Sequence, residues 1–316
     1  MAEDIREDRE EPGRDGAAGH LFHGADGGRP APTPWRGRSV RSKVALAAAA
    51  ALAVAFAGGC AYVSERQGEL IFRPNKDAWR GYSAERYPFE EHWIPVGNEQ
   101  KLHAWWLKGD DPGAPVVLYL HGARWNLTGS VTRIDRWRQL GFAVLAVDYS
   151  GFGKSSDIAP TEEYAYEDAE TAWEYLAKLA PRRERYIVGH SLGGAIAAEL
   201  ARRRPDASGL VLEATFTSVR DMVEHTAFSW LPVGLILTQK FDTLSKVSEL
   251  KMPVLVTHGT LDAIVPFEMG ERLYQAVKSP KRFIKVEGGS HHNLSSAAFA
   301  EYRAALTELF GLKRKS

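Results

Sequence analysis

The sequence predicts an α/β protein with a mostly parallel sheet of eight strands and helices on both of its faces. Three observations support this fold class. Short apolar runs alternate with helical stretches from residue 91 to residue 309, a pattern typical of parallel sheets. Runs such as Pro115–Leu120 are apolar throughout, as expected for strands buried on both faces. One run leads directly into Gly189–Gly193, Gly-His-Ser-Leu-Gly, and then into an Ala-rich helical stretch.

Composition limits the classes of function. The chain has 316 residues, a formal net charge of zero and one cysteine. A balanced charge gives no support for nucleic-acid binding. One cysteine excludes an internal disulfide and a cysteine-based zinc site. We therefore expect no nucleic-acid partner, and the sequence does not indicate an oligomeric state.

The first 63 residues differ in composition from the rest. Residues 1–43 are rich in Gly, Pro and charged residues, and we expect them to be disordered. Residues 44–63 form an apolar run of a length that can cross a bilayer as a helix. Basic residues precede this run and would stay in the cytoplasm. This interpretation places the domain at 64–316 outside the cytoplasm.

A bacterial lipoprotein signal is the alternative for the same segment. Arg41–Lys43 has the character of a basic n-region and Val44–Phe56 that of its apolar h-region. Ala57–Cys60 resembles a lipobox, in which Cys60 would be lipidated. Translation starting at Val40 would put this signal at the very N-terminus. Both interpretations predict a membrane-anchored protein with an extracytoplasmic domain.

The domain at 64–316 contains every predicted element of the sheet. Its first two strands flank a Gly97–Asn98 turn, which indicates a hairpin. The predicted strands are Glu91–Val96, Lys101–Leu107, Pro115–Leu120, Phe142–Val147, Tyr186–Val188, Leu210–Glu213, Pro253–Thr257 and Arg282–Val286. The predicted helices are Thr132–Leu140, Glu162–Leu179, Ala195–Leu200, Pro266–Val277 and Ser295–Leu309.

The alternation of strands and helices breaks between residues 216 and 250. This segment follows the sixth predicted strand and contains an apolar stretch interrupted by Pro and Gly. We expect it to form a small cap above Ser191. Its apolar side chains include Trp230, Leu231, Leu235 and Ile236.

Ser191 is the predicted nucleophile. A serine on a sharp turn between a strand and a helix exposes its hydroxyl above the sheet. The turn is so tight that glycines are expected on both sides of it, here at 189 and 193. The backbone N–H of Leu192 opens the next helix and can face an oxyanion. A second N–H is expected after the third strand, where Ala123 follows His-Gly.

Asp262 is the predicted acid, because it follows a buried strand at the edge where open α/β sheets keep their chemistry. A carboxylate that merely stabilises the turn at Pro266 is the structural alternative. Glu213 and Asp148 also end strands and remain alternatives for the acid. The neighbours of Asp148 favour a carboxylate that holds a turn.

The predicted base follows the last strand. Two histidines stand side by side there, and the Gly-x-x-His spacing from Gly288 favours His291 over His292. The order Ser191, Asp262, His291 is the one found in hydrolases with a strand-to-helix serine. A metal site is disfavoured, because no further cluster lies at ligand spacing in the sequence.

From about residue 65 to residue 312 the chain resembles the α/β-hydrolase superfamily. Within it, the chain is similar to small membrane-anchored serine hydrolases of the Bem-type and depalmitoylating kinds. The resemblance is carried by Leu120–Gly122, Asp148–Ser155, Gly189–Gly194, His258–Asp262 and Gly288–His291. It implies Ser191 as nucleophile, Asp262 as acid and His291 as base. Two positions depart from the family pattern: Ala123 replaces a common Asn, and Ser290–Asn293 replaces Gly-His-Asn-Asp.

The expected function is hydrolysis of an ester or thioester of an apolar acyl group through an acyl-enzyme on Ser191. The apolar cap and the membrane segment favour a small acyl-ester or lipid-like substrate. This chemistry requires neither a cofactor nor a metal. Two alternatives stay open at this point. One is a serine peptidase or aminopeptidase on the same fold, and the other is a non-catalytic protein that uses the fold for binding.

Overall fold

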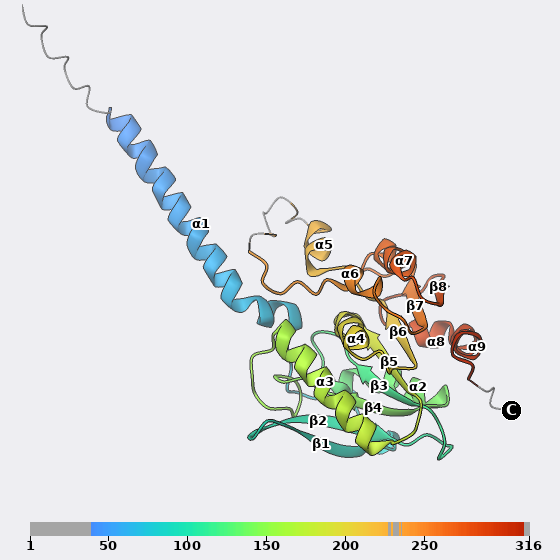
Figure 1. Ribbon diagram of the computed structural model, residues 1–316. Helices are drawn as coiled ribbons and strands as arrows, with labels where there is room; N and C mark the ends of the chain where they lie inside the picture. Colours follow the sequence, from blue (N-terminus) through green and yellow to red (C-terminus); the bar gives the residue numbers. More distant parts are fainter. Residues whose placement is uncertain (1–38, 227–228, 230–233, 235, 313–316) are drawn as a thin grey trace, which may run out of the picture. The chain divides into compact units, whose positions relative to one another are not determined.

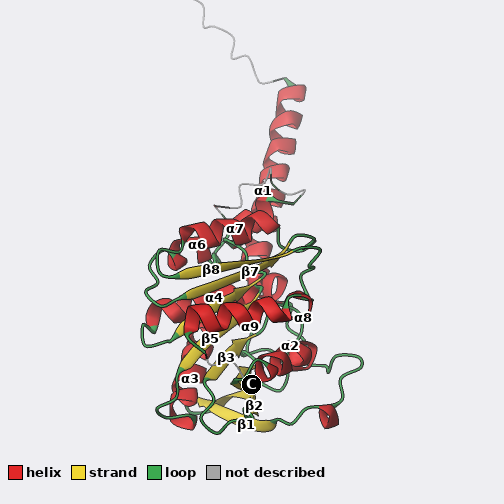
Figure 2. Cartoon of the chain, turned by 90° about the vertical axis from the view of Figure 1, so that its right-hand side faces the viewer, coloured by secondary structure: helices red, strands yellow, loops and turns green. Residues whose placement is uncertain are grey.

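One sheet organises the domain. The computed structural model describes residues 39–226, 229, 234 and 236–312. Within them eight strands lie in the order β1-β2-β4-β3-β5-β6-β7-β8 (Figures 1 and 2). The pairs β1–β2 and β2–β4 are antiparallel and all other neighbours are parallel, which confirms the predicted sheet. The strands are β1 (Glu90–Val96), β2 (Gln100–Leu107), β3 (Val116–Leu120), β4 (Ala143–Val147), β5 (Arg185–His190), β6 (Gly209–Glu213), β7 (Val254–Gly259) and β8 (Lys281–Val286).

Helices cover both faces of this sheet. α3, α4, α6 and α7 share one apolar core with it, and α2, α8 and α9 share a second. The helices are α1 (Val40–Phe72), α2 (Leu127–Gln139), α3 (Glu162–Leu179), α4 (Leu192–Arg203), α5 (Val219–Glu224), α6 (Thr243–Val247), α7 (Phe267–Ala276), α8 (Leu294–Ala297) and α9 (Phe299–Phe310), with a 3₁₀ turn at Ala84–Arg86.

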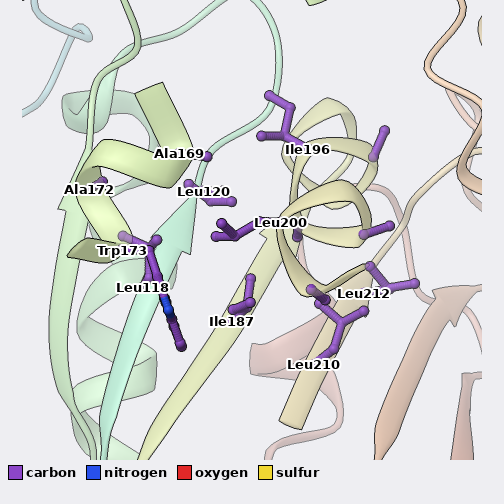
Figure 3. Packing of buried hydrophobic residues seen from close by; sticks show 14 of the residues in the cluster. Leu118, Leu120, Ala169, Ala172, Trp173, Ile187, Ile196, Leu200, Leu210 and Leu212 are labelled. Atoms are coloured by element: carbon purple, nitrogen blue, oxygen red, sulfur yellow. The ribbon is translucent and has the colours of Figure 1, made fainter. Parts of the chain in front are cut away.

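The two cores follow from the alternation of side chains along each strand. In β3, Leu118 and Leu120 belong to the first core, whereas Val117 and Tyr119 belong to the second. Figure 3 shows Leu118 and Leu120 beside α3 and α4 in the first core. The strand therefore has to be apolar at every position, which explains the unbroken apolar runs of the sequence.

α1 is long and apolar enough to cross a membrane. Its apolar side chains, such as Leu52 and Phe56, are exposed. The chain divides into two compact units, Met1–Leu52 and Ala53–Ser316, and the division falls inside this helix. Of the predicted disordered segment 1–43, residues 1–38 lie outside the described residues, and Val40 already begins the helix.

The last turns of α1 belong to the second unit. Phe72 is fully buried and packs against Phe152 and Phe241. The side chain of Gln67 is also buried and donates a hydrogen bond to the carbonyl oxygen of Ile236 (2.7 Å). The helix therefore ends inside the domain's core.

The observed helices differ from the predicted ranges at several ends, and most clearly at α2 and at the C-terminus. α2 begins at Leu127 and not at Thr132, because Asn126 caps the helix through a hydrogen bond from the Thr128 N–H. The single helix predicted over Ser295–Leu309 is two helices, α8 and α9, since the backbone leaves the helical region at Ala298 (φ −121°, ψ 38°).

The segment between β6 and β7 breaks the alternation, as expected, and contains α5 and α6. Three of its predicted apolar cap residues, Trp230, Leu231 and Leu235, lie outside the described residues. Thr217 and Leu237 of this segment line a separate cavity together with Arg272 of α7. None of its described residues lines the pocket of Ser191.

Candidate active site

Ser191 lies on a strained turn between β5 and α4. Its φ of 54° and ψ of −121° are rare for a residue with a side chain. The neighbouring glycines are required by close backbone contacts. A Cβ at Gly189 would lie 2.2 Å from the carbonyl oxygen of Gly193, and a Cβ at Gly193 would lie 2.1 Å from that of Leu120. The sequence Gly-His-Ser-Leu-Gly therefore permits this turn.

His291 and Asp262 form a hydrogen-bonded pair next to Ser191. Nδ1 of His291 lies 2.8 Å from Oδ2 of Asp262. The other oxygen of Asp262 accepts the N–H groups of Ile264 and Val265, each at 2.9 Å. Asp262 therefore both holds the turn before α7 and orients the histidine ring.

The electrostatic environment keeps Asp262 ionised. Burial alone raises the pKa of this carboxyl group. Contacts with His258 and His291 and the N–H of Val265 outweigh burial and hold the pKa well below its usual value. A fixed negative charge thus faces Nδ1 of His291 at neutral pH.

The two adjacent histidines have different partners. His291 is buried and contacts Asp262, whereas His292 is exposed and its Nδ1 lies 3.0 Å from Nη2 of Arg133. Arginine can only donate, so Nδ1 of His292 accepts this hydrogen bond. Only His291 has the carboxylate partner that a base beside a serine needs.

The other two acidic candidates contact different groups. Glu213 is buried and accepts a hydrogen bond from the hydroxyl of Tyr302 (2.8 Å). Burial raises its pKa to about 7. Asp148 accepts the N–H of Leu127 (2.8 Å) and contacts His103 and His121. It thus holds the start of α2 in the loop after β3.

Ser191, His190, His291 and His292 line one pocket of about 410 Å³, a size within the range of small-molecule sites. The rest of its lining comes from the loop Gly122–Trp125, from α2 and from Trp79 and Ile264. Among the described residues the Ser191 hydroxyl has no hydrogen-bond partner. Such bonds are often long in a free enzyme and shorten when substrate binds.

Two backbone N–H groups beside Ser191 are available for a ligand. Leu192 is the first residue of α4, so its N–H has no acceptor within the helix. The N–H of Ala123 has no acceptor among the residues that the structure describes. The next N–H in this loop, that of Arg124, donates to the carbonyl oxygen of Phe72 (2.8 Å) and is therefore occupied.

Sequence reasoning missed four pocket residues: Trp79, Arg124, Trp125 and Arg133. Trp79 and Trp125 are partly exposed and stack edge to face, with ring centroids 4.4 Å apart. Arg133 lies inside the predicted helix, but its contact with His292, 159 residues away, has no local signal. The earlier start of α2 did have one, Asn126, since Asn is a favoured N-cap.

Three histidines in the pocket lie close enough together to share a metal ion. The ligand atoms of His190, His291 and His292 are within 4.8 Å of one another. One nitrogen of each ring contacts His291 O, Asp262 or Arg133, which leaves the second nitrogen of each ring as a possible ligand. Arg124 and Arg133 line the same pocket, and their positive charge disfavours a cation there.

Relatives of known sequence match most of the domain. The family model Hydrolase_4, described as "Serine aminopeptidase, S33", matches residues 111–245. An uncharacterized protein of Mycobacterium tuberculosis is 31% identical over 261 residues, covering 79% of this chain and 89% of that protein. Lysophosphatidylserine lipase ABHD12 of Danio rerio is 30% identical over 215 residues, covering 60% of this chain and 55% of that protein.

Solved structures share the fold at low sequence identity. The esterase PF2001 of Pyrococcus furiosus superposes with a TM-score of 0.62 at 17% identity, covering 75% of this chain and 96% of that one. Alpha/beta hydrolase domain-containing protein 10 from mouse gives a TM-score of 0.52 at 20% identity, covering 70% and 98%. With the sheet order and these matches together, the chain belongs to the α/β-hydrolase superfamily.

Proposed function

We propose that the protein is a membrane-anchored serine hydrolase that cleaves the carboxylic ester, or thioester, of a single acyl chain. Ser191 is the nucleophile, His291 the base and Asp262 the acid. The observation that carries this proposal is the Asp262–His291 pair, which lies in the same pocket as a serine on a strained turn. A buried loop histidine without a catalytic role would not need this combination.

The reaction follows from the contacts of each group. Asp262 fixes the proton of His291 on Nδ1, so Nε2 can accept the proton of the Ser191 hydroxyl as its oxygen attacks the carbonyl carbon. The N–H groups of Ala123 and Leu192 stabilise the resulting oxyanion. The tetrahedral intermediate collapses to the acyl-enzyme, and Nε2 returns the proton to the leaving alkoxide. Water then repeats these steps on the acyl-enzyme and releases the acid.

The substrate class rests on the pocket walls and on the relatives. Trp79, Trp125 and Ile264 give the pocket apolar walls, which suit an acyl chain. The relatives named lysophosphatidylserine lipases act, by that name, on a lipid with one acyl chain. α1 would hold the domain at the membrane in which such lipids reside. We therefore favour a lysophospholipid-like ester as the substrate.

An aminopeptidase is the competing function, because the family model carries that description. Such an enzyme has to bind the positively charged amino terminus of a peptide. No described residue lining the pocket is Asp or Glu, whereas Arg124 and Arg133 both line it. The like charge of these arginines would repel an ammonium group, and this disfavours the aminopeptidase.

Hydrolysis of matched substrates tests the proposal. The full chain in neutral detergent should hydrolyse p-nitrophenyl esters, with kcat/KM rising from acetyl to longer acyl chains. Ser191→Ala should abolish this turnover and leave the melting temperature within a few degrees. Amino-acyl p-nitroanilides should be cleaved at least a hundredfold more slowly. Faster cleavage of the anilides than of the esters would contradict the ester-hydrolase assignment.

A further inference from the structure

The charged side chains that line the pocket of Ser191 are of one sign, positive. Two arginines, Arg124 and Arg133, line it, and no carboxylate does so among the described residues. Asp262 lies behind His291 with its side chain fully buried. A ligand that enters the pocket therefore meets positive charge without a compensating negative group.

Arg133 is a half-buried cation without an acidic partner. Its Nη2 lies 3.0 Å from Nδ1 of His292, a ring that offers a lone pair but no charge. No carboxylate lies within 4.0 Å of it in the described part of the chain. Arg138, one turn further along α2, contacts both Asp135 (2.8 Å) and Asp110 (3.0 Å). The outward arginine of α2 is thus paired with two carboxylates, whereas the pocket arginine contacts none among the described residues.

Arg124 adds a second charge from the loop after β3. Its φ of 78° lies in the left-handed region, where a side chain costs energy. The strain is held by the hydrogen bond from its N–H to the carbonyl oxygen of Phe72. Its side chain is exposed at the pocket and has no ion pair within the described residues.

The charge of Arg133 reaches the groups around Ser191. Burial lowers the pKa of His190 well below its usual value, and Arg133 lowers it further. Burial also lowers the pKa of His292, with added contributions from His291, Arg133 and Arg124. Uncompensated arginines in a concave site are the usual means of binding phosphate or carboxylate groups, since their donors match those oxygens.

We propose that Arg133, together with Arg124, binds an anionic group of the substrate, a phosphate or carboxylate carried beside the ester that Ser191 attacks. This subsite rests on the proposed ester hydrolysis, because it assigns a role to residues of the same pocket. Arg133 donates hydrogen bonds to the anionic group from α2. Arg124, which is exposed on the loop after β3, adds a second positive charge beside it. Both are specificity residues, since the reaction at Ser191 does not require them chemically.

Competitive inhibition separates charge recognition from catalysis. The substrate is p-nitrophenyl butyrate, which is neutral, and the competitors are hexyl phosphate and hexanol, which share one alkyl chain. For the wild type we expect an inhibition constant for hexyl phosphate at least tenfold below that for hexanol. R133Q should raise the constant for hexyl phosphate at least tenfold and that for hexanol less than twofold. R124Q should have a smaller effect in the same direction.

Two further variants control this experiment. R136Q alters an arginine of the same helix that contacts Gln139 and does not line the pocket, so it should change neither constant. R133K keeps the charge without the forked donors and should fall between wild type and R133Q. If R133Q weakens hexyl phosphate and hexanol alike, or weakens neither, the anionic subsite is wrong. Inorganic phosphate inhibiting as strongly as hexyl phosphate would indicate a free-anion site and would also overturn the proposal.

Failure of the subsite can be told apart from failure of the proposed function. Calorimetric titration of Ser191→Ala with hexyl phosphate measures anion binding without any turnover. Binding that is lost in the Ser191→Ala, Arg133→Gln double variant supports the subsite even if no ester is hydrolysed. Ester hydrolysis with no calorimetric binding of hexyl phosphate retains the hydrolase and contradicts the subsite.

Discussion

Two buried aspartates follow parallel strands of the sheet, and each contacts two histidines. Asp148 follows β4 and lies 3.3 Å from Nδ1 of His103 and 3.4 Å from Nε2 of His121. Asp262 follows β7 and lies 2.8 Å from Nδ1 of His291 and 3.4 Å from Nε2 of His258. The residue types and the burial are alike, so composition alone does not tell the two clusters apart.

The clusters differ in whether a ring nitrogen without a hydrogen bond belongs to a residue that lines the pocket of Ser191. Around Asp148, the second nitrogen of His103 contacts Glu91 (3.2 Å), and that of His121 bonds to the carbonyl oxygen of Gly122 (2.7 Å). The fourth ring nitrogen, Nε2 of His121, makes only the 3.4 Å contact with Asp148 and is fully buried. Such a cluster stabilises the fold and has no position at which a proton can be exchanged with a substrate.

Around Asp262, two ring nitrogens have no hydrogen bond among the described residues: Nδ1 of His258, which is fully buried, and Nε2 of His291. His291 is held through Nδ1 and lines the pocket of Ser191, and its Nε2 has no partner among the described residues. A catalytic site is therefore recognised by a donor or acceptor that the fold leaves unused at a pocket.

The largest loss of activity is expected when Nε2 of His291 is removed. His291→Ala should lower kcat by about 10⁴-fold or more and change the melting temperature little. His103→Ala should do the reverse, because its nitrogens serve only the fold. Steady-state kinetics and thermal unfolding of both variants make the test. If His292→Ala loses as much activity as His291→Ala, the assignment of the base is wrong.

Substitutions of the two aspartates should also have different effects, one on activity and the other on stability. Asp262→Asn should reduce kcat by roughly 10³- to 10⁴-fold, since the ring of His291 would lose its tautomer. Asp148→Asn should instead lower the free energy of unfolding by about 3–5 kcal/mol, as for breaking a buried charge pair. Urea unfolding and ester turnover measured on both variants check this. Equal loss of activity in both would remove the distinction between the clusters.

Acid should weaken both clusters. Burial raises the pKa of Asp148, but His103 and His121 outweigh it and lower the pKa overall; the pKa of Asp262 is lowered as well. A lowered pKa means that each carboxylate stabilises the fold above the unfolded value of about 3.9. This stability is lost as pH falls through the lower folded values. The melting temperature should therefore drop below about pH 4, and less steeply in Asp148→Asn. If the melting temperature of Asp148→Asn drops as steeply as that of the wild type, ionised Asp148 is not a source of the acid sensitivity.

Glu213 is a buried carboxyl group that pairs with Tyr302 and with no histidine. Burial raises its pKa to about 7, and its unfolded value is about 4.3. The folded state thus binds the proton more tightly, and stability falls as pH rises from about 4 to about 7. Glu213→Gln keeps an acceptor for Tyr302 and should be more stable than the wild type at pH 8, by on the order of 2 kcal/mol. The prediction is wrong if the stability of Glu213→Gln relative to the wild type is no greater at pH 8 than at pH 5.

The sheet and the groups at its strand ends were predictable, because both depend on local sequence. Unbroken apolar runs predict strands such as β3, and Gly189 and Gly193 predict the turn at Ser191. The Asp262–His291 contact was predicted from order along the chain, and the structure brings the two side chains together.

Other features depend on contacts that are distant in sequence. The partner of His292 is Arg133, 159 residues away, and no local pattern indicates it. Trp79 and Trp125 meet where hydrogen bonds link their two segments, from the Arg124 N–H to Phe72 O and from the Trp79 N–H to Oγ1 of Thr128. The pocket's charge therefore became visible only in three dimensions.

The most direct test of the account is to find which residue reacts as the nucleophile. The full-length protein in neutral detergent is treated with a fluorophosphonate, digested, and mapped by mass spectrometry. The account predicts phosphonylation of Ser191, none in Ser191→Ala, and labelling at least a hundredfold slower in His291→Ala with His292→Ala as its matched control. Labelling of a different residue, or undiminished labelling of Ser191→Ala, would contradict it.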